Sequence, residues 1–298
     1  MTYYYLKIGR GNGDADAWLA GRNPLGCPAA VIYFDDRPEE VYFEGEGEAQ
    51  ARAFWQCGRE HADRQAVFIV IFAGEVWFLR PAGPIQFLRA IWHGRRRILP
   101  KAMPVEIFKR VSTREVPFVL ATMPTNRYLS SGTFRKIGHP GNLRAIDVVL
   151  GNPPRGALWE CDRGQPERLI QCLSSVEFET LVARIFEAAG CHVPAYRGGC
   201  IPEVDIFAHN PTRRMISLGD VGIRPRRSLS CQVKLKLREG WRPQGADVVI
   251  CGERNGEEVL GADWVLNRVL ESPSVRRWLQ RSLAWLPEGF LGVYGLGK

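Results

Sequence analysis

Residues 201–210 read IPEVDIFAHN, and residues 230–236 read SCQVKLK. Both are short runs of strand-forming apolar residues that also carry polar side chains. Side chains alternate between the two faces of a strand, so Gln232 and Lys234 share one face while Val233 points to the other. The spacing predicts a sheet with one face turned to the core and a polar face available for chemistry.

The polar residues of these two stretches suit a divalent metal ion that assists phosphodiester hydrolysis. If the strands pair, Asp205 lies beside Gln232, and Mg²⁺ prefers carboxylate, amide and carbonyl oxygens as ligands. Asp205 and Gln232 are therefore the predicted ligands of Mg²⁺ or Mn²⁺, with the backbone carbonyl of Val233 as a third. Lys234 is predicted to position the attacking water and offset developing negative charge. Glu179, on a helix predicted to precede the strands, is the candidate ligand of a second metal ion.

Each of these residues also has a simpler interpretation. Gln232, Lys234 and Lys236 would form a solvated sheet face if no metal binds there. Glu177 and Glu179 would then only complement the positive end of the helix dipole.

Composition places the chain among globular proteins. It has 298 residues, of which 45% are hydrophobic and 24% are charged, enough to build one large domain or two ordinary ones. The N-terminus lacks the apolar core of a signal peptide, and no apolar run is long enough to cross a bilayer, which predicts a cytoplasmic protein without membrane contact. Eight scattered cysteines without a C-x-x-C pair predict reduced, buried thiols.

The charge balance predicts a polyanionic partner. Lys and Arg number 40 against 32 Asp and Glu, and the basic residues cluster at 93–101, 211–215 and 224–228. A solvated, Arg-rich surface is the alternative. The candidate nucleic-acid-binding residues are Trp92, Arg95, Arg96, Arg97, Arg127, Arg135, Arg224, Arg226 and Arg227. Arg213 and Arg214 lie in the same segment as the last three, between Asp205 and Gln232.

The chain is predicted to form two domains joined by a linker. Residues 1–150 are rich in aromatic and β-branched runs and predict a curved sheet, with strands at 2–8, 29–34, 39–43, 66–81 and 116–124 and one helix within 46–62. The segment 66–81 predicts a hairpin that turns near Gly74. Residues 151–170 contain enough Pro and Gly to predict a linker.

Residues 171–298 are predicted to form an α/β domain. An amphipathic helix covers 173–190, with Ser174 or Ser175 as its N-cap. Strands are expected at 204–209, 215–222, 229–237 and 246–252. Two helices, interrupted at Ser272–Pro273, are expected to close the chain.

The order of these elements resembles a known nuclease family. VEFETLVARIFEAAG (176–190), PEVDIFA (202–208), CQVKLK (231–236) and ADVVI (246–250) are similar to the PD-(D/E)xK nuclease superfamily, in particular its Mrr-like restriction endonucleases. The resemblance covers about 173–251 and implies a restriction-endonuclease-like α/β/α domain. It maps the helical acid onto Glu179, the metal-binding acid onto Asp205, and the Q-x-K onto Gln232 and Lys234. The segment RGGCIPEVD (197–205), which leads into the acidic strand, departs from the Gly-rich pattern of that branch. Either Glu203 or Asp205 could therefore be the main metal ligand, and strand alternation favours Asp205.

The first domain faintly resembles PUA-like domains, including EVE domains that read modified bases. YYYLKIGRG (3–11) would open a curved sheet or barrel and NRYLSSGTFRKI (126–137) would close it. A reader of flipped bases needs an aromatic pocket beside phosphate-binding groups. The candidates for such a pocket are Trp18, Trp55, Trp77 and Trp92, although Trp77 fits a core position as well.

Together these features predict a Mg²⁺-dependent DNA endonuclease for restriction or antiviral defence against foreign or modified DNA. Cutting both strands requires two active sites, so a homodimer is expected. One alternative is a catalytically inactive nucleic-acid-binding protein on a nuclease-like fold. Another is a nuclease that acts on RNA or is triggered by a small effector.

Overall fold

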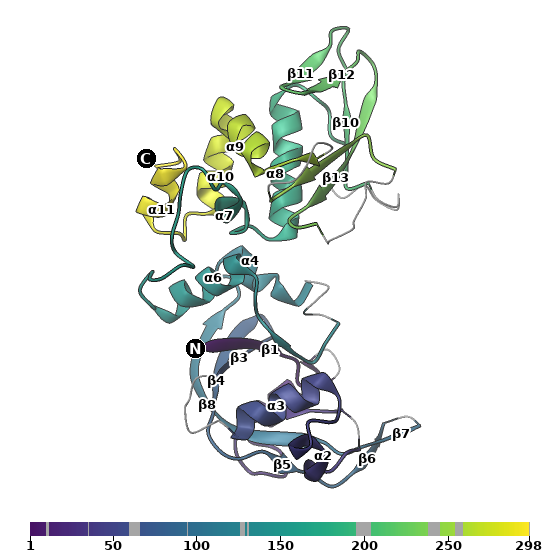
Figure 1. Ribbon diagram of the computed structural model, residues 1–298, viewed down its shortest axis with the longest axis vertical. Coiled ribbons are helices and arrows are strands. Elements are labelled where there is room, and N and C mark those ends of the chain that lie inside the picture. The colour runs from purple at the N-terminus through teal and green to yellow at the C-terminus, as the bar shows by residue number, and fades with distance from the viewer. Residues whose placement is uncertain are drawn as a thin grey trace. The chain divides into compact units, whose positions relative to one another are not determined.

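The computed structural model divides the chain into two compact units, Met1–Gly138 and His139–Lys298 (Figure 1). The structure describes residues 1–9, 12–34, 36–59, 66–93, 95–125, 129, 131–194, 204–237, 245–253 and 259–297. No helix within these ranges is long and apolar enough to cross a bilayer. The protein is of mixed α/β class, and each unit has its own sheet.

A curled sheet of half-barrel form builds the first unit. The strands are β1 (Thr2–Leu6), β2 (Ala29–Ile32), β3 (Ala66–Phe72), β4 (Glu75–Pro81), β8 (Lys101–Ser112) and β9 (Phe134–Lys136), in the order β2-β8-β4-β3-β1-β9, with β5 (Gln86–Phe87) also on β8. Only β1 and β3 pair in parallel among them. A separate ribbon is formed by β6 (Ile91–His93) and β7 (Arg96–Ile98).

The hairpin and the helix predicted for this unit are both present. Ala73 and Gly74 take positive φ of 50° and 77° between β3 and β4, as the tight turns that match strand twist require. Helix α3 (Ala49–Arg59) packs Phe54 against Phe68 and Phe134, whose rings lie 5.9 and 5.3 Å from its own. Helix α1 (Ala15–Leu19) lies beside β2.

Two segments predicted as strands are helical instead. Residues 39–43 form α2 (Glu39–Phe43), and 116–124 contain α4 (Phe118–Ala121) and the 3₁₀ turn η3 (Met123–Thr125). Pro38 and Pro117 stand at the N-caps of α2 and α4, where a fixed φ and a missing N–H suit the start of a helix. The aromatic and β-branched composition of such short runs was therefore misleading.

The second unit contains a four-stranded mixed sheet. Its strands are β10 (Ile206–His209), β13 (Ser228–Lys234), β14 (Val248–Cys251) and β15 (Val259–Leu260), in that order. The first pair is antiparallel and the other two are parallel. Between β10 and β13 the chain makes the small hairpin of β11 (Ile216–Leu218) and β12 (Val221–Ile223).

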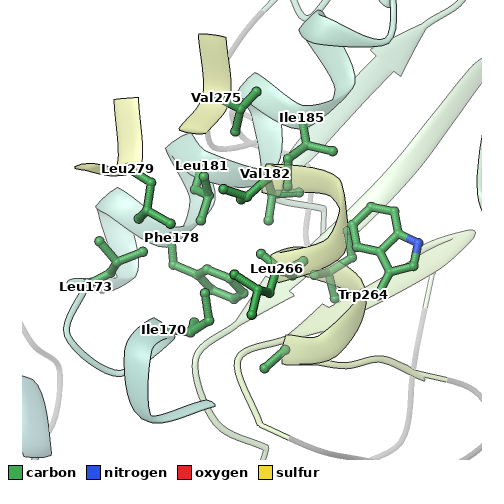
Figure 2. Close-up of a cluster of buried hydrophobic side chains, with 14 of the residues drawn as sticks. Ile170, Leu173, Phe178, Leu181, Val182, Ile185, Trp264, Leu266, Val275 and Leu279 are labelled. Atoms are coloured by element: carbon green, nitrogen blue, oxygen red, sulfur yellow. The ribbon is translucent and has the colours of Figure 1, made fainter. Parts of the chain in front are cut away.

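Helices cover one face of this sheet. The long α8 (Ser175–Ala188) packs against β10 and β13 and also against α9 (Ala262–Glu271) and α10 (Pro273–Ser282). Figure 2 shows the apolar side chains that meet there, among them Phe178, Leu266 and Leu279. The remaining helices of the unit are α6 (Pro140–Leu150), α7 (Glu167–Ile170) and α11 (Glu288–Val293).

Local signals in the sequence fix the helix ends correctly. Ser174 caps α8 through a reciprocal capping box with Glu177, so the first of the two predicted N-caps is the one used. The predicted interruption at Ser272–Pro273 separates α9 from α10, where the Ser272 hydroxyl accepts from the Val275 N–H.

The predicted linker is part of the second unit's core. The units divide after Gly138 rather than after residue 150, and Trp159, Leu169 and Ile170 are buried with α8. Arg144 of α6, only 2% exposed, donates to the carbonyls of Leu158 and Arg168 at 2.8 and 3.0 Å. Pro and Gly shape the irregular backbone of 151–170, while its apolar side chains fold inward.

Cysteines are packing residues throughout the described part of the chain. The seven described there are free thiols, and five of them are buried. Burial raises the pKa of Cys172 and Cys191 to about 11 each, which keeps both protonated at neutral pH.

Candidate active site

Strands β10 and β13 bring Asp205 and Lys234 into contact. The Asp205 N–H donates to the Cys231 carbonyl at 2.9 Å and so extends the pairing beyond Ile206. The Asp205 carboxylate accepts from the Val233 N–H at 2.7 Å and from the Lys234 ammonium at 3.0 Å, in both cases through Oδ2. The carboxylate is thus held in place through Oδ2, while Oδ1 has no hydrogen-bond partner among the described residues.

Gln232 shares the face of β13 that carries Lys234. On β14 its neighbour is Val249, and the regular β10–β13 register ends one residue before it, at the pair Ile206–Cys231. Its side chain is only 5% exposed, yet Oε1 has no hydrogen-bond partner among the described residues. Leaving a buried acceptor unpaired costs about 1–3 kcal/mol, so this oxygen is suited to a ligand that binds there.

The backbone of Val233 adds a further oxygen to this place. In an antiparallel strand the N–H and C=O of one residue point to the same side. Because the Val233 N–H points at Asp205, its carbonyl is directed to that side as well. Asp205, Gln232 and the backbone of Val233 therefore each carry an oxygen of the kind that Mg²⁺ prefers.

Only one of these donors is charged. Within the described residues, no three His, Cys, Asp or Glu side chains gather to hold a metal ion. The oxygen set would therefore bind a divalent ion weakly by itself and would need water and substrate phosphate to complete its coordination. Glu203, the alternative acid, lies outside the described residues.

The predicted helical acid, Glu179, is half-buried on α8, and α8 packs on the face of β13 that carries Cys231 and Val233. Its neighbour Glu177 has a structural role, since it accepts from the Ser174 N–H at 2.8 Å, and burial raises its pKa. Asp205 and Lys234 are the predicted site residues that the strands bring into direct contact.

Burial also affects the pKa of Cys231, the residue before Gln232 on β13. Burial raises the pKa of Cys231 strongly, and the charge of Asp205 raises it further. Cys231 therefore remains a neutral thiol in the core and cannot compete as a charged ligand.

Two loops beside the sheet present the predicted arginines to solvent. Asn210, fully buried, donates to the carbonyls of Arg214 and Ile223 at 2.8 and 2.9 Å and thereby joins the segments before β11 and after β12. The exposed arginines on these segments are Arg213, Arg214, Arg224, Arg226 and Arg227. One buried amide therefore joins the two segments that carry these five exposed arginines, and exposed arginines suit contacts with phosphate.

The β6–β7 ribbon carries the predicted basic cluster of the first unit. Trp92 is 73% exposed and lies opposite Arg97 across the ribbon, and Arg95 is exposed near its turn. Arg135 on β9 is half-buried next to Gly132. The Arg96 side chain and Arg127 lie outside the described residues.

Three of the four tryptophans proposed for a base pocket have other surroundings. Trp18 and Trp55 are 8% and 3% exposed in the core, where their ring N–H groups donate to Tyr33 and Glu39. Trp77 stacks on Phe72 at 5.3 Å, and the Arg110 guanidinium lies over it at 4.3 Å. Trp92 alone of the four is strongly exposed.

Sequence reasoning missed Asn210, which organises the arginine loops. The Asn-Pro pair at 210–211 is a turn signal in the sequence and marks this position. Its structural role became visible only with the hydrogen bonds from its side chain to both loops.

No family model, curated protein or solved structure matches the chain.

Proposed function

We propose that the chain is a metal-dependent DNA endonuclease that acts in restriction or defence against foreign or modified DNA. The observation that carries this proposal is the placement of three residues. Asp205 contacts Lys234 at the end of the paired strands, and Gln232, two residues before Lys234 on β13, carries a buried oxygen without a partner among the described residues.

Each residue has a defined task in this proposal. Asp205, Gln232 and the Val233 carbonyl would hold Mg²⁺ or Mn²⁺, which supplies Lewis acidity and activates water when bound. Lys234, which is paired with Asp205 and partly exposed, orients the water and offsets the charge that develops on phosphorus. Arg224, Arg226 and Arg227 bind phosphates and hold the substrate beside the sheet.

The fold of the second unit supports the nuclease assignment. A capped helix, an acid on one strand, and Q-x-K on the antiparallel neighbour occur in the order that restriction-endonuclease-like domains use. In the proposal the first unit, PUA-like in its curled sheet, recognises the substrate through Trp92, Arg95 and Arg97. A homodimer would cut both strands.

A catalytically inactive nucleic-acid-binding protein is the second candidate. It is favoured by the single carboxylate of the oxygen set and by the ion pair that already neutralises Asp205. Such a protein would keep the arginine loops and bind nucleic acid without metal-dependent cleavage.

The test compares Lys234→Ala with Lys236→Ala. Lys236 lies two residues after the end of β13, and its side chain is 78% exposed and pairs with Glu253 at 3.3 Å. Both variants and the parent protein are incubated with modified plasmid DNA, unmodified plasmid DNA and RNA, with Mg²⁺, Mn²⁺ or EDTA. We expect metal-dependent DNA cleavage by the parent and by Lys236→Ala, and a loss of at least about 100-fold in Lys234→Ala.

The outcomes separate the candidates. Cleavage that Lys234→Ala retains would overturn the assigned site. Binding of DNA without cleavage in any metal would favour the inactive protein, and cleavage of RNA alone would change the substrate.

A further inference from the structure

Helices α8 and α10 border a solvent-accessible hollow of about 430 Å³. Its lining includes Arg184, Glu187, Ser274, Arg277, Trp278 and Arg281. A second hollow of about 360 Å³ adjoins it and shares Arg277 and Arg281. We call the two hollows together the α8–α10 groove.

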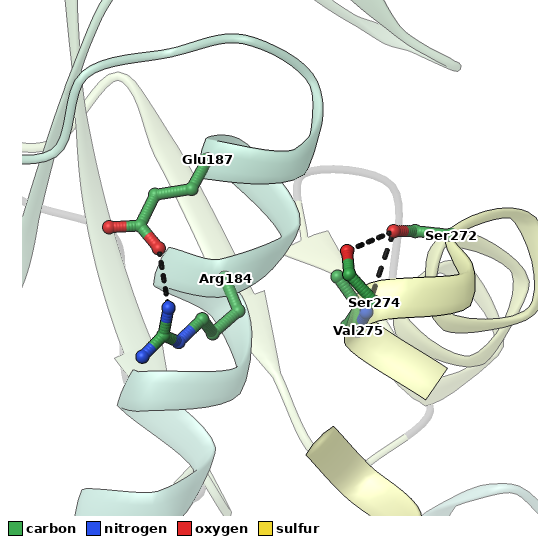
Figure 3. A network of polar contacts seen from close by, with 5 residues as sticks. All are labelled: Arg184, Glu187, Ser272, Ser274 and Val275. Carbon is green, nitrogen blue, oxygen red and sulfur yellow. Dashed lines mark hydrogen bonds and ion pairs between the residues drawn. The ribbon is translucent and has the colours of Figure 1, made fainter. Parts of the chain in front are cut away.

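The first hollow has an excess of positive charge. Three guanidinium groups line it with a single carboxylate, Glu187, which is already paired with Arg184 at 3.3 Å (Figure 3). Arg277 and Arg281 are exposed and have no ion-pair partner among the described residues. Four residues apart on a helix, their side chains start about 5–6 Å from each other and point to one side.

Two other arginines, Arg268 of α9 and Arg276 of α10, make contacts within the fold. Arg276 donates to the Gly295 carbonyl at 2.7 Å, and Arg268 pairs with Glu271 at 2.6 Å. Arg277 and Arg281 make no such contact within the described residues, although they stand one and five positions after Arg276. Within the described residues, no contact that stabilises the fold therefore accounts for the position of Arg277 and Arg281 in the lining of the hollow.

Two neutral features favour a phosphate-bearing ligand at the same place. Ser274 and Val275, in the first turn of α10, line the hollow, so the positive end of the α10 dipole lies there. Trp278 lines the same wall, half-buried and packed against the core, and an aromatic residue in such a wall suits stacking with a base. The second hollow adds Glu288, which limits its own positive charge.

We propose that the α8–α10 groove binds the phosphate backbone of a nucleic-acid strand. The groove is shallow and continues past Arg277 and Arg281 into the second hollow, which suits an extended polyanion. None of its residues belongs to the Asp205 site or to the arginine loops. The inference adds a binding surface to the proposed function and does not depend on catalysis.

The test uses two variants of equal charge. Arg277→Gln/Arg281→Gln removes the groove cations, whereas Arg155→Gln/Arg163→Gln removes two exposed arginines of the same unit that line neither hollow. Binding of a labelled duplex and a labelled single strand is measured by fluorescence anisotropy in EDTA at several salt concentrations. EDTA prevents metal-dependent cleavage, so a failure of the proposed nuclease activity would not affect this result.

We expect the groove variant to bind about tenfold more weakly at low salt. Its slope of log affinity against log salt should fall by about 1.8 for duplex DNA, and the control should match the parent. Equal affinities and slopes for both variants would overturn the proposal. Binding of labelled polyphosphate or of a labelled acidic peptide that the groove variant loses, with no nucleic-acid binding by the parent, would also overturn it and assign the groove to that ligand.

Discussion

The carboxylate of Asp205 and the ammonium of Lys234 form an ion pair of 3.0 Å across two antiparallel strands. The same carboxylate oxygen accepts from the Val233 N–H, so the two strands are joined by a side chain where regular pairing ends. Lys234 is 36% exposed in its side chain, and an ion pair with that exposure contributes about 0–1 kcal/mol. Its role is therefore better sought in chemistry than in stability.

Gln232→Glu should make the protein depend on divalent metal for stability. The new carboxylate replaces a buried oxygen that has no donor among the described residues, so the free energy of unfolding in EDTA should fall by at least about 1–3 kcal/mol. Added Mg²⁺ should restore it, because binding to the folded state stabilises that state. Thermal unfolding of the variant and the parent, with EDTA and with Mg²⁺, measures both effects.

Gln232→Leu is the matched control for this substitution. It removes the orphan oxygen, so its stability in EDTA should equal or exceed that of the parent and should not respond to Mg²⁺. A Gln232→Glu variant with no response to Mg²⁺ or Mn²⁺ would contradict the assignment of Gln232 to a metal site.

Arg226→Gly should weaken nucleic-acid binding without loss of stability. Arg226 has φ of 56°, a left-handed conformation that costs a non-glycine residue about 1–2 kcal/mol. Glycine removes this strain, although it also loosens the unfolded chain, so the net change should lie between zero and a gain of about 1 kcal/mol. Urea unfolding and DNA binding in EDTA give the two readouts.

Ala73→Gly is the control, because Ala73 also has positive φ and stands in the β3–β4 turn of the other unit. It should change stability in the same way and leave DNA affinity unchanged. Equal DNA affinity of the Arg226→Gly variant and the parent would show that the strained position is not held for phosphate binding.

Arg144→Met should destabilise the second unit. The arginine donates to the carbonyls of Leu158 and Arg168, and its guanidinium lies 5.1 Å from the ring of Phe290. Methionine fills part of the space but leaves both carbonyls without this donor, at a cost of about 2–5 kcal/mol in the free energy of unfolding. Calorimetry should show a lower midpoint for the second unit, while Arg155→Met, at an exposed position, should shift it little. A stable Arg144→Met variant would mean that 151–170 behaves as the linker that its composition suggests.

Local sequence signals predicted much of this fold. The Ser174–Glu177 capping box and Ser272–Pro273 mark helix ends through their own chemistry, and strand alternation set Gln232 and Lys234 on one face. Runs of four or five apolar residues were ambiguous, because such a length fits a strand or one helical turn, and α2 and α4 proved helical.

Other features depend on contacts that are distant in sequence. The burial of Arg144 depends on carbonyls 14 and 24 residues away, and the orphan state of Gln232 Oε1 depends on what surrounds it in space. Composition therefore misplaced the boundary between the units.

His139 should make the stability of the second unit depend on pH. Burial, with a further contribution from the charge of Arg144, lowers the pKa of His139 to about 4 from an ordinary value of 6.5. The folded state therefore resists protonation more than the unfolded state does. The contribution of His139 to stability is complete above pH 6.5 and is lost as pH falls from 6.5 towards 4, by about 2–4 kcal/mol.

Urea unfolding of the parent and of His139→Gln at pH 7.5, 5.5 and 4.5 isolates this effect, because carboxylates titrate alike in both proteins. The difference in the free energy of unfolding between the two proteins should narrow as pH falls. A constant difference across the three pH values would show that folding does not lower the pKa of His139.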